Sequence, residues 1–315
     1  MKFEHFIITR FNLPIYSKIK TGTISSLNDN YIEERLHLFM NYCLPSIIQQ
    51  STQKFKWLVL FDERTPSKYK KLINSIHNKY QNFIPCYLDL NNYKEIPKEY
   101  IEYYKEYISY LDDNEYVSIH NNINEYIRMI YVPKFINDCI HKHSTIDTDF
   151  ILTTRIDNDD AFHKDFINNI QLEAQKHKSL ILLDYINGYR FLLDKRIVNK
   201  FCTYNGHFTT LMEQRNKSLH TVMYWSHNIA HKIIPIKHIN TLPMYIELIH
   251  DTNVSNVEQK TSFYDFIYAI KNFKASDFGY KNIRLSLWNN LRTFLKLLAI
   301  HTKNYLIYRF KKQDY

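Results

Sequence analysis

The chain has 315 residues, of which 45% are hydrophobic and 23% are charged, a composition ordinary for a globular protein with a real core. Only four residues are glycine, and no segment matches GxGxxG or GxxxxGK[ST], which argues against P-loop NTPases and typical NAD enzymes. The net charge of +9 is uneven, because residues 261–315 hold ten Lys or Arg and three Asp, a net charge of +7. The basic character therefore belongs to the tail rather than to the body.

The start of the chain and its cysteines favour a cytosolic protein. Residues 1–5 lack the long apolar run of a secretory signal, and no uncharged apolar run reaches the roughly 18 residues that a membrane span needs. The cysteines lie far apart and form no CxxC pair, so we expect reduced, mostly buried thiols. They are Cys43, Cys86, Cys139 and Cys202.

The chain opens with a strand, a helix and a second strand. The run FEHFIITRFNLPI predicts a strand that ends at Asn12 and Pro14. Residues 31–50 carry apolar side chains at helical spacing, and residues 57–61 form a buried-strand run that stops at Asp62. The helical positions are Ile32, Leu36, Phe39, Cys43 and Ile47. This order is the beginning of an α/β fold.

The second half of the chain returns to strand patterns after a region that is hard to interpret. Within residues 67–143 the Tyr- and Lys-rich segment 98–116 is expected to be an exposed surface region. Residues 150–154 predict a strand, and Phe162, Phe166 and Ile170 then repeat at the spacing of a helix face. Two strands are expected around a turn at Asn187-Gly188, and MYIELIH predicts a final strand. These elements complete the α/β pattern.

Three carboxylates and an Asn are packed into residues 157–160, directly after the predicted strand 150–154. Like charges so close need compensation from solvent, helix N-terminal amides or a metal ion. Asp157 and Asp159 are spaced to share one hard cation, and Mg²⁺ or Mn²⁺ would leave its other positions to water and substrate phosphates. Open α/β sheets bind ligands beyond the carboxyl ends of their strands. The alternative is that one or two of these residues only cap the following helix, with Asp160 as the expected cap.

Other metal sites fit the sequence less well. An EF-hand loop that began at Asp157 would need Gly at its sixth position and Glu at its twelfth, where Phe162 and Asn168 stand. His227 and His231 have the spacing of two ligands on a helix but no third ligand nearby, so no zinc is inferred.

Several segments together resemble one family. They are HFIITRFNLPI, YIEERLHLFMNYCLPSIIQQSTQKFKWLVLFDERTP, ILTTRIDNDDAFHKDFI, YINGYRF and IELIHDTNVSN, which cover about residues 3–257 in order. They look like the successive motifs of the rhamnosyltransferase family, which belongs with glycosyltransferases of the GT-A architecture. The resemblance implies a Rossmann-type sandwich, with a mixed central sheet flanked by helices, in residues 1–260. Residues 261–315 would be a basic helical extension.

The resemblance also implies roles for individual residues. It makes Asp157 and Asp159 an Asp-x-Asp site for Mn²⁺ or Mg²⁺, and it places His250 where such folds often supply a further contact to the metal or diphosphate. The block around His250 departs from the family pattern at Met244-Tyr245 and Asp251-Thr252, and a hydrogen-bonded His at a strand end is the alternative there.

Charged residues near the predicted strand ends are candidates for donor binding. With Asp157, they are Arg10, Asp62 and Arg155. The arginines could pair with phosphate through their forks of donors, and Asp62 could accept hydrogen bonds from a base or ribose. An ordinary salt bridge is the alternative for each residue.

The predicted reaction moves a sugar from a nucleotide diphosphate, a dTDP- or UDP-sugar, to a hydroxyl of a glycan or lipid-linked acceptor. A carboxylate would take the proton of the attacking hydroxyl. Glu213 is the first candidate for this base and Asp184 the second, although a solvated helix acid and a turn acid are the respective alternatives. Donor sugar, acceptor and stereochemical outcome stay open, with rhamnose suggested only by the family's name.

The basic tail can be interpreted in two ways. Its apolar residues lie along one helical face with basic residues interspersed, and a basic amphipathic helix can lie on an anionic membrane. The apolar residues are Leu287, Leu291, Phe294, Leu295 and Leu298, and the basic ones are Arg284, Arg292, Lys296 and Lys303. That would place an enzyme of cell-surface polysaccharide synthesis at the inner face of the membrane. Packing on the domain is the alternative, and the nearly neutral body argues against nucleic acid as a partner.

Two other functions remain open at this level. One is a non-catalytic glycan- or membrane-binding protein on the same fold, and the other is a metal-dependent phosphodiesterase or nuclease. Donor hydrolysis would separate both from a transferase.

Overall fold

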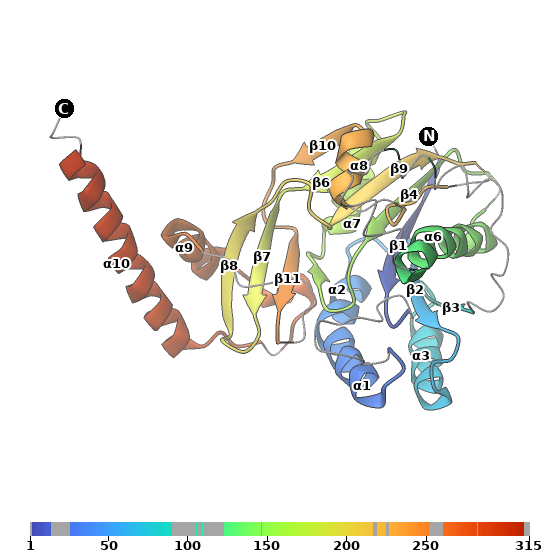
Figure 1. Cartoon of the computed structure of the whole chain (residues 1–315), viewed down its shortest axis with the longest axis horizontal. Helices are drawn as coiled ribbons and strands as arrows, with labels where there is room; N and C mark the ends of the chain where they lie inside the picture. The colour runs from blue at the N-terminus through green and yellow to red at the C-terminus, as the bar shows by residue number, and fades with distance from the viewer. Residues whose placement is uncertain are drawn as a thin grey trace.

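The computed structural model of the chain describes residues 2–13, 26–89, 105, 109, 123–145, 147–216, 219–224, 227–251, 261–281 and 283–311. These residues form two sheets with helices on both faces of the larger one (Figure 1). The segment 98–116, predicted as a surface region, lies outside the described residues except for positions 105 and 109. The predicted boundary at residue 260 also lies outside them, so the division into 1–260 and 261–315 stays a prediction.

The large sheet has seven strands in the order β10-β6-β9-β4-β1-β2-β3. Only β9 runs antiparallel to its neighbours, so the sheet is mixed, as predicted. Its strands are β1 (Phe3–Arg10), β2 (Lys56–Asp62), β3 (Phe83–Leu88), β4 (Phe150–Arg155), β6 (Ile181–Tyr185), β9 (Thr209–Gln214) and β10 (Ile236–Ile239). Because β1, β2 and β4 are parallel and buried on both faces, they appear in the sequence as continuous apolar runs.

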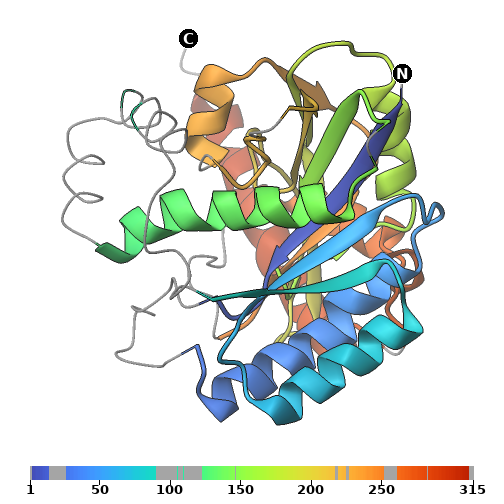
Figure 2. The ribbon, with the colours of Figure 1, turned by 90° about the vertical axis from the view of Figure 1, so that its right-hand side faces the viewer.

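Helices cover the two faces of this sheet (Figure 2). Side chains such as Ile7, Val59 and Leu152 pack on α1 (Asp29–Leu38), α2 (Leu44–Ile48), α3 (Ser67–Lys79) and α7 (Phe166–Ala174). The alternate residues, among them Ile8 and Leu60, pack on α6 (Ile123–His143) at the other face. A smaller cluster holds α8 (His227–Ile233) against β6 and β9.

The predicted helix over residues 31–50 is confirmed as one helical stretch, but it is interrupted. Asn28 caps α1, since its side chain accepts hydrogen bonds from the backbone N–H groups of Asn30 and Tyr31. A π-helical segment, η1 (Phe39–Cys43), follows, and α2 begins with Pro45 among its first residues. A π-bulge of this kind is rare in helices and is frequent at functional sites.

The small sheet has the order β5-β11-β7-β8, with β5 (Ala161–Phe162), β11 (Tyr245–Ile249), β7 (Asn187–Leu192) and β8 (Ile197–Cys202). Two predictions are corrected here. Phe162 lies in β5 and not on the helix, which begins at Phe166, because residue 162 pairs with Tyr245 of β11. Asn187 and Gly188 are the first residues of β7 rather than a turn, and the chain changes sheets at Ile186.

The C-terminal helices lie beyond the small sheet. They are α9 (Phe263–Asn272), the 3₁₀ helix η3 (Ala275–Phe278) and α10 (Leu287–Lys311). α9 packs on β8, and α10 runs past α9 and extends away from the body (Figure 1). Within the described residues, no helix is both long enough and apolar enough to cross a membrane. The cysteines are free thiols, three of them buried and Cys202 exposed.

Candidate active site

The acidic segment 157–160 follows β4 at the carboxyl ends of the parallel strands of the large sheet. The Asn158 side chain donates hydrogen bonds to the backbone oxygens of Arg10 (3.3 Å) and Phe11 (3.1 Å), just where β1 ends. Cys43 donates from Sγ to the backbone oxygen of Asp157 over 3.6 Å. These contacts fix the segment to β1 and to the π-helical segment η1.

Asp157 faces two arginines at the strand ends. Arg155 donates to both carboxylate oxygens from Nη2, over 3.1 and 3.0 Å, and Arg10 Nη2 lies 4.0 Å from Oδ1. Burial acts to raise the pKa of Asp157, but the positive charges of Arg155 and Arg10 outweigh it and lower that pKa well below its ordinary value. The Asp157 side chain is 34% exposed, so this ionised carboxylate is partly buried and partly open to solvent.

Asp159 points to a different set of partners. Its Oδ2 accepts a hydrogen bond of 2.8 Å from Nη1 of Arg35 in α1 and lies 2.9 Å from Nε2 of His250 after β11. Since a carboxylate only accepts, the His250 ring donates from Nε2. Arg35 also donates to Asn158 Oδ1 over 3.3 Å. All three charged or titratable side chains are less than 10% exposed, which makes this a buried ionic group.

Asp160 is the most buried of the three carboxylates. Its Oδ1 accepts a hydrogen bond of 2.9 Å from the backbone N–H of Leu248 in β11, and its Oδ2 lies 3.4 Å from Nε2 of His207. Burial and the neighbouring carboxylates of Asp159 and Asp157 raise the pKa of Asp160 well above its ordinary value. The sequence left open that Asp160 only caps the following helix. It does not, because its carboxylate is bonded to β11 and α7 begins after Asp165.

Among the described residues, one group has the geometry of a metal site: Asp157, Asp160 and His207, each with one ligand atom within 4.8 Å of the other two. Burial lowers the pKa of His207, although the charge of Asp157 opposes it, so the ring favours its neutral, ligating form. The group shares Asp157 with the predicted Asp157, Asp159 and His250 set. The roles predicted for Asp159 and His250 stay predictions.

The donor-binding candidates lie at the strand ends, as predicted. Asp62 ends β2 and is buried, and its carboxylate accepts hydrogen bonds from the backbone N–H and the guanidinium of Arg64. Arg10 and Arg155 end β1 and β4 and both face Asp157. Arg10, Asp62 and Arg155 thus each form the salt bridge that was the alternative to donor binding. Their roles in donor binding stay predictions.

Glu213 lies away from this cluster. It pairs across the sheet with Ile151 near the start of β4, roughly 13 Å along the strand from Arg155. Its two carboxylate oxygens accept hydrogen bonds from the backbone N–H groups of His220 (3.0 Å) and Thr221 (2.9 Å). This position anchors the segment that follows β9, and a role as general base stays a prediction.

Asp184 lies closer to the cluster. It pairs with Thr209 at the start of β9, two residues after His207. Its Oδ2 accepts hydrogen bonds from the backbone N–H of Asn205 (2.9 Å) and from Nδ1 of His238 (3.0 Å). Its Oδ1 is buried and has no hydrogen-bond partner among the described residues. Burial raises the pKa of Asp184.

Sequence reasoning missed Arg35 and His207 and assigned Asp160 to a cap. Arg35 lies in a charged stretch of α1, where one Arg among Glu residues gives no sign of being buried. His207 stands alone in a polar segment with no ligand spacing. Only the run of three acids could have suggested that Asp160 is functional.

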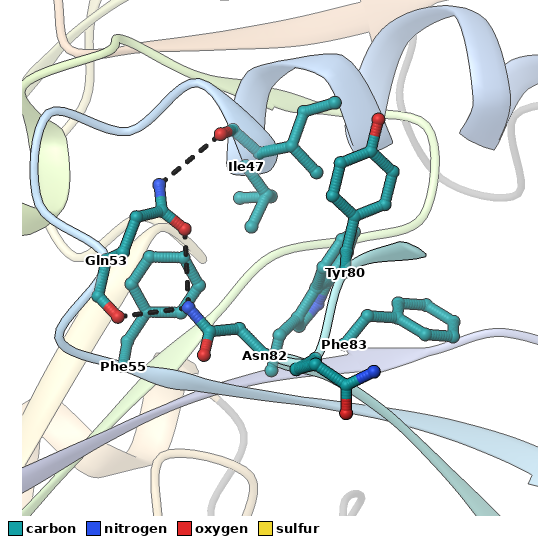
Figure 3. A pocket seen from close by; sticks show the side chains of 9 residues that line it. Ile47, Gln53, Phe55, Tyr80, Asn82 and Phe83 are labelled. Atoms are coloured by element: carbon teal, nitrogen blue, oxygen red, sulfur yellow. Dashed lines mark hydrogen bonds between the residues drawn. The ribbon is translucent and has the colours of Figure 1, made fainter. Parts of the chain in front are cut away.

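A cavity of about 240 Å³ lies at the opposite end of the sheet, and Figure 3 shows its lining. Phe55, Trp57 and Phe83 stand at the amino ends of β2 and β3, while Gln53 and Asn82 are joined at its edge by a 3.3 Å hydrogen bond. The acidic cluster lies at the carboxyl ends of the strands, so this cavity is not part of the candidate active site.

Three crystal structures of TarS from S. aureus resemble the chain distantly. A fragment of residues 1–349 is 11% identical, with a TM-score of 0.37, and the match covers 79% of this chain and 60% of that one. TarS itself is 11% identical, with a TM-score of 0.36, and the match covers 79% of this chain and 37% of that one. The fragment in complex with UDP-GlcNAc is 13% identical, with a TM-score of 0.37, and the match covers 95% of this chain and 72% of that one.

The chain thus spans about 60% and 37% of the first two of these structures. No curated protein sequence matches the chain. The family comparison is more specific, because a family model described as "Putative rhamnosyl transferase" matches residues 4–109 and 127–262. These ranges include β1, β2, β4, the segment 157–160 and β11. The chain therefore belongs to this family of glycosyltransferases, on the predicted fold with a mixed sheet flanked by helices.

Proposed function

We propose that the chain is a metal-dependent glycosyltransferase. It moves a sugar, rhamnose by the family's description, from a dTDP- or UDP-sugar to a hydroxyl of a glycan or lipid-linked acceptor in cell-surface polysaccharide synthesis. One observation carries the proposal: Asp157, Asp160 and His207 gather beside Arg10 and Arg155 at the carboxyl ends of parallel strands. Open α/β sheets bind their ligands at this edge.

The side chains present fit a divalent cation. Two carboxylates suit Mg²⁺ or Mn²⁺, and an imidazole is a ligand more typical of transition metals, so the set favours Mn²⁺. When bound, the ion supplies positive charge that stabilises the departing diphosphate. Asp157 is ionised and partly exposed. The charge of the ion would counter the neighbouring carboxylates that raise the pKa of Asp160, so binding favours the ionised form of Asp160.

The set predicted from the sequence, with Asp159 and His250, is the competing proposal. Arg35 weighs against it, because its guanidinium already pairs with Asp159 over 2.8 Å and does not deprotonate. Arg155 pairs with Asp157 in a similar way, but the Asp157 side chain is 34% exposed and the Asp159 side chain only 9%, so a cation reaches Asp157 more easily. In our preferred assignment Asp159, Arg35 and His250 instead form the rigid wall against which Asp157 and Asp160 are held.

Arg10 and Arg155 are the proposed contacts for the donor diphosphate. Each is only partly exposed and faces the open carboxylate Asp157, so a phosphate entering here meets two guanidinium groups together. Guanidinium forks match phosphate oxygens geometrically, which orients the leaving group. Asp62, held by Arg64 at the end of the neighbouring strand β2, is proposed to contact the ribose or base.

Asp184 is the better placed of the two candidate bases. Asp184 pairs with Thr209, which follows His207 by two residues. Its Oδ1 has no hydrogen-bond partner among the described residues, whereas both carboxylate oxygens of Glu213 accept hydrogen bonds. A carboxyl group whose pKa is raised toward the working pH takes a proton from a hydroxyl more readily. We therefore assign proton removal from the acceptor hydroxyl to Asp184, with Glu213 as the alternative.

The metal assignment is tested by thermal unfolding with Mn²⁺, UDP or dTDP, and both together. We expect Mn²⁺ and nucleotide together to raise Tm more than either alone. Asp160→Asn and His207→Gln should abolish this extra rise, while Asp138→Asn, which changes an exposed carboxylate on α6, should keep it. If Asp159→Asn abolishes the rise and Asp160→Asn does not, the predicted set replaces ours.

The reaction itself is tested with a panel of sugar nucleotides and mass detection of released nucleotide and transferred sugar. Turnover that requires Mn²⁺ and falls at least about 100-fold in Asp184→Asn supports the proposal. Cleavage of phosphate esters without sugar transfer would instead identify a phosphodiesterase.

A further inference from the structure

The helix α10 carries two adjacent apolar faces, since Phe294 lies only about 20° around the helix from Leu287. One face packs on α9, where the rings of Phe294 and His301 lie 5.7 and 5.4 Å from the ring of Phe263. The half-buried residues Asn290, Phe294, Leu297 and His301 follow each other at helical spacing and mark this contact. Packing on α9 therefore accounts for only part of the apolar surface of α10.

The second face is exposed. It is a stripe of residues at positions i, i+4, i+8 and i+11, together with two aromatic residues beside it. We call it the leucine stripe: Leu287, Leu291, Leu295 and Leu298, with Trp288 and Tyr305. Leu287 is 88% and Trp288 75% exposed, and no described residue covers the stripe. Contiguous apolar surface of this kind on a folded protein marks an interaction site.

Basic side chains lie along one side of the stripe, opposite the side that packs on α9. Arg292, Lys296 and Lys303 are exposed, and each follows a residue of the exposed face by one position, which places it about 100° around the helix. From residue 287 to residue 311 the sequence contains five Lys or Arg and no Asp or Glu. The helix thus presents an apolar stripe bordered by positive charge alone.

The first turn of α10 is attached to the body. The backbone N–H of Ser286 donates to the backbone oxygen of Arg196 over 3.0 Å, and the Asn289 side chain donates to that of Lys195 over 2.8 Å. Both acceptors lie in the connection between β7 and β8, whose two basic side chains are exposed. The helix therefore leaves the small sheet in a defined direction and reaches away from the body (Figure 1).

We propose that the leucine stripe of α10 binds the surface of an anionic lipid bilayer. The helix would lie in the plane of the interface, with the leucines and Trp288 among the acyl chains and the cations at the level of the phosphates. It does not cross the bilayer, since it is not apolar enough to span one. This inference concerns a surface outside the candidate active site and does not depend on the proposed reaction.

The charge of α10 favours lipid over a second copy of the chain. Two copies joined through their stripes would bring five cations from each helix to one interface, with no acidic residue on either helix to balance them, and like charges repel. An anionic bilayer instead attracts every one of these side chains.

The test is co-sedimentation of the full chain with vesicles of phosphatidylcholine or of an equimolar mixture with phosphatidylglycerol. We expect binding to the mixed vesicles only, and loss of binding in high salt. Arg292→Gln/Lys296→Gln/Lys303→Gln should weaken the partition about 100-fold, and Leu291→Ser/Leu295→Ser at least about 10-fold. These side chains are exposed, so the variants should melt like the parent protein.

Matched controls change equally exposed residues on the body. Leu172→Ser/Leu242→Ser and Lys71→Gln/Lys178→Gln/Lys237→Gln should bind the mixed vesicles as the parent does. Absence of binding by the parent protein, or equal losses in the control variants, would overturn the proposal. A dimer in sedimentation velocity that Leu291→Ser/Leu295→Ser dissociates would assign the stripe to a second copy instead.

Discussion

Replacing Arg35 by Met should destabilise the protein strongly. The pair with Asp159 is buried on both sides, with side chains 8% and 9% exposed, so Arg35→Met leaves a buried carboxylate without its cation. Removing one partner of a buried ion pair costs about 3–5 kcal/mol. With an unfolding entropy of about 2.1 cal/mol/K per residue, a chain of 315 residues should lose roughly 5–8 °C in Tm.

A second substitution separates charge from packing. Asp159→Asn in the Arg35→Met background removes the stranded charge, so part of the lost stability should return, with a coupling of at least about 1 kcal/mol. The control is Lys68→Met, which breaks the exposed pair with Asp29 and should cost no more than about 1 kcal/mol. Urea unfolding of five proteins, the parent, Arg35→Met, Asp159→Asn, the double variant and Lys68→Met, measures the free energies and the coupling, and thermal melts measure Tm. If Arg35→Met costs no more than Lys68→Met, or if Asp159→Asn deepens its loss, the buried pair does not stabilise the fold as we argue.

Three further predictions concern single sites. Burial raises the pKa of Glu213 to about 7 against backbone hydrogen bonds from Thr221 and His220, so the native state keeps this proton to higher pH than the unfolded chain. Stability should fall as pH rises from about 4.5 to about 7, by up to about 3 kcal/mol, and urea titrations should show this fall removed in Glu213→Gln. Gly188→Ala should cost about 1–3 kcal/mol in thermal melts, because the added Cβ would lie 2.3 Å from the Tyr245 ring, while Gly206→Ala, with its nearest atom at 3.1 Å, should cost clearly less; equal losses would contradict the packing argument. Tyr245→Phe should leave Tm unchanged or raise it, since the buried hydroxyl has no partner among the described residues, and a large fall would show that this hydroxyl is bonded.

The central strands and the acidic segment could be predicted because their causes are local. β1, β2 and β4 are buried on both faces, so each is a continuous apolar run that ends at a polar residue. The segment 157–160 is unusual in any sequence, and its position after β4 follows from chain order alone.

The division of roles among the carboxylates could not be predicted, because it is set by distant residues. Asp159 is engaged by Arg35, which is 124 positions away, and Asp160 by the backbone of Leu248, 88 positions away. Nothing in the spacing of Asp157, Asp159 and Asp160 says which one meets a guanidinium and which one meets an imidazole.

The change of sheet at Ile186 escaped prediction for a related reason. The residues on both sides of Ile186 have strand patterns, and only the partners show that β6 joins β9 and β10 while β7 joins β8 and β11. Asn187 and Gly188 resemble a hairpin turn in the sequence but begin β7. The glycine is required there because the Tyr245 ring lies directly against it and leaves no room for a side chain.

The segment 157–160 is hydrogen-bonded to both sheets and so links their positions. Asn158 is tied to the end of β1 in the large sheet, and Asp160 is tied to Leu248 in the small one. A tilt of one sheet against the other would therefore act on the positions of Asp157 and Asp160, because the segment is attached to both sheets. In the proposed metal site, such a tilt would change which ion fits best, so substitutions far from the carboxylates, at the contact between the sheets, would alter the metal preference.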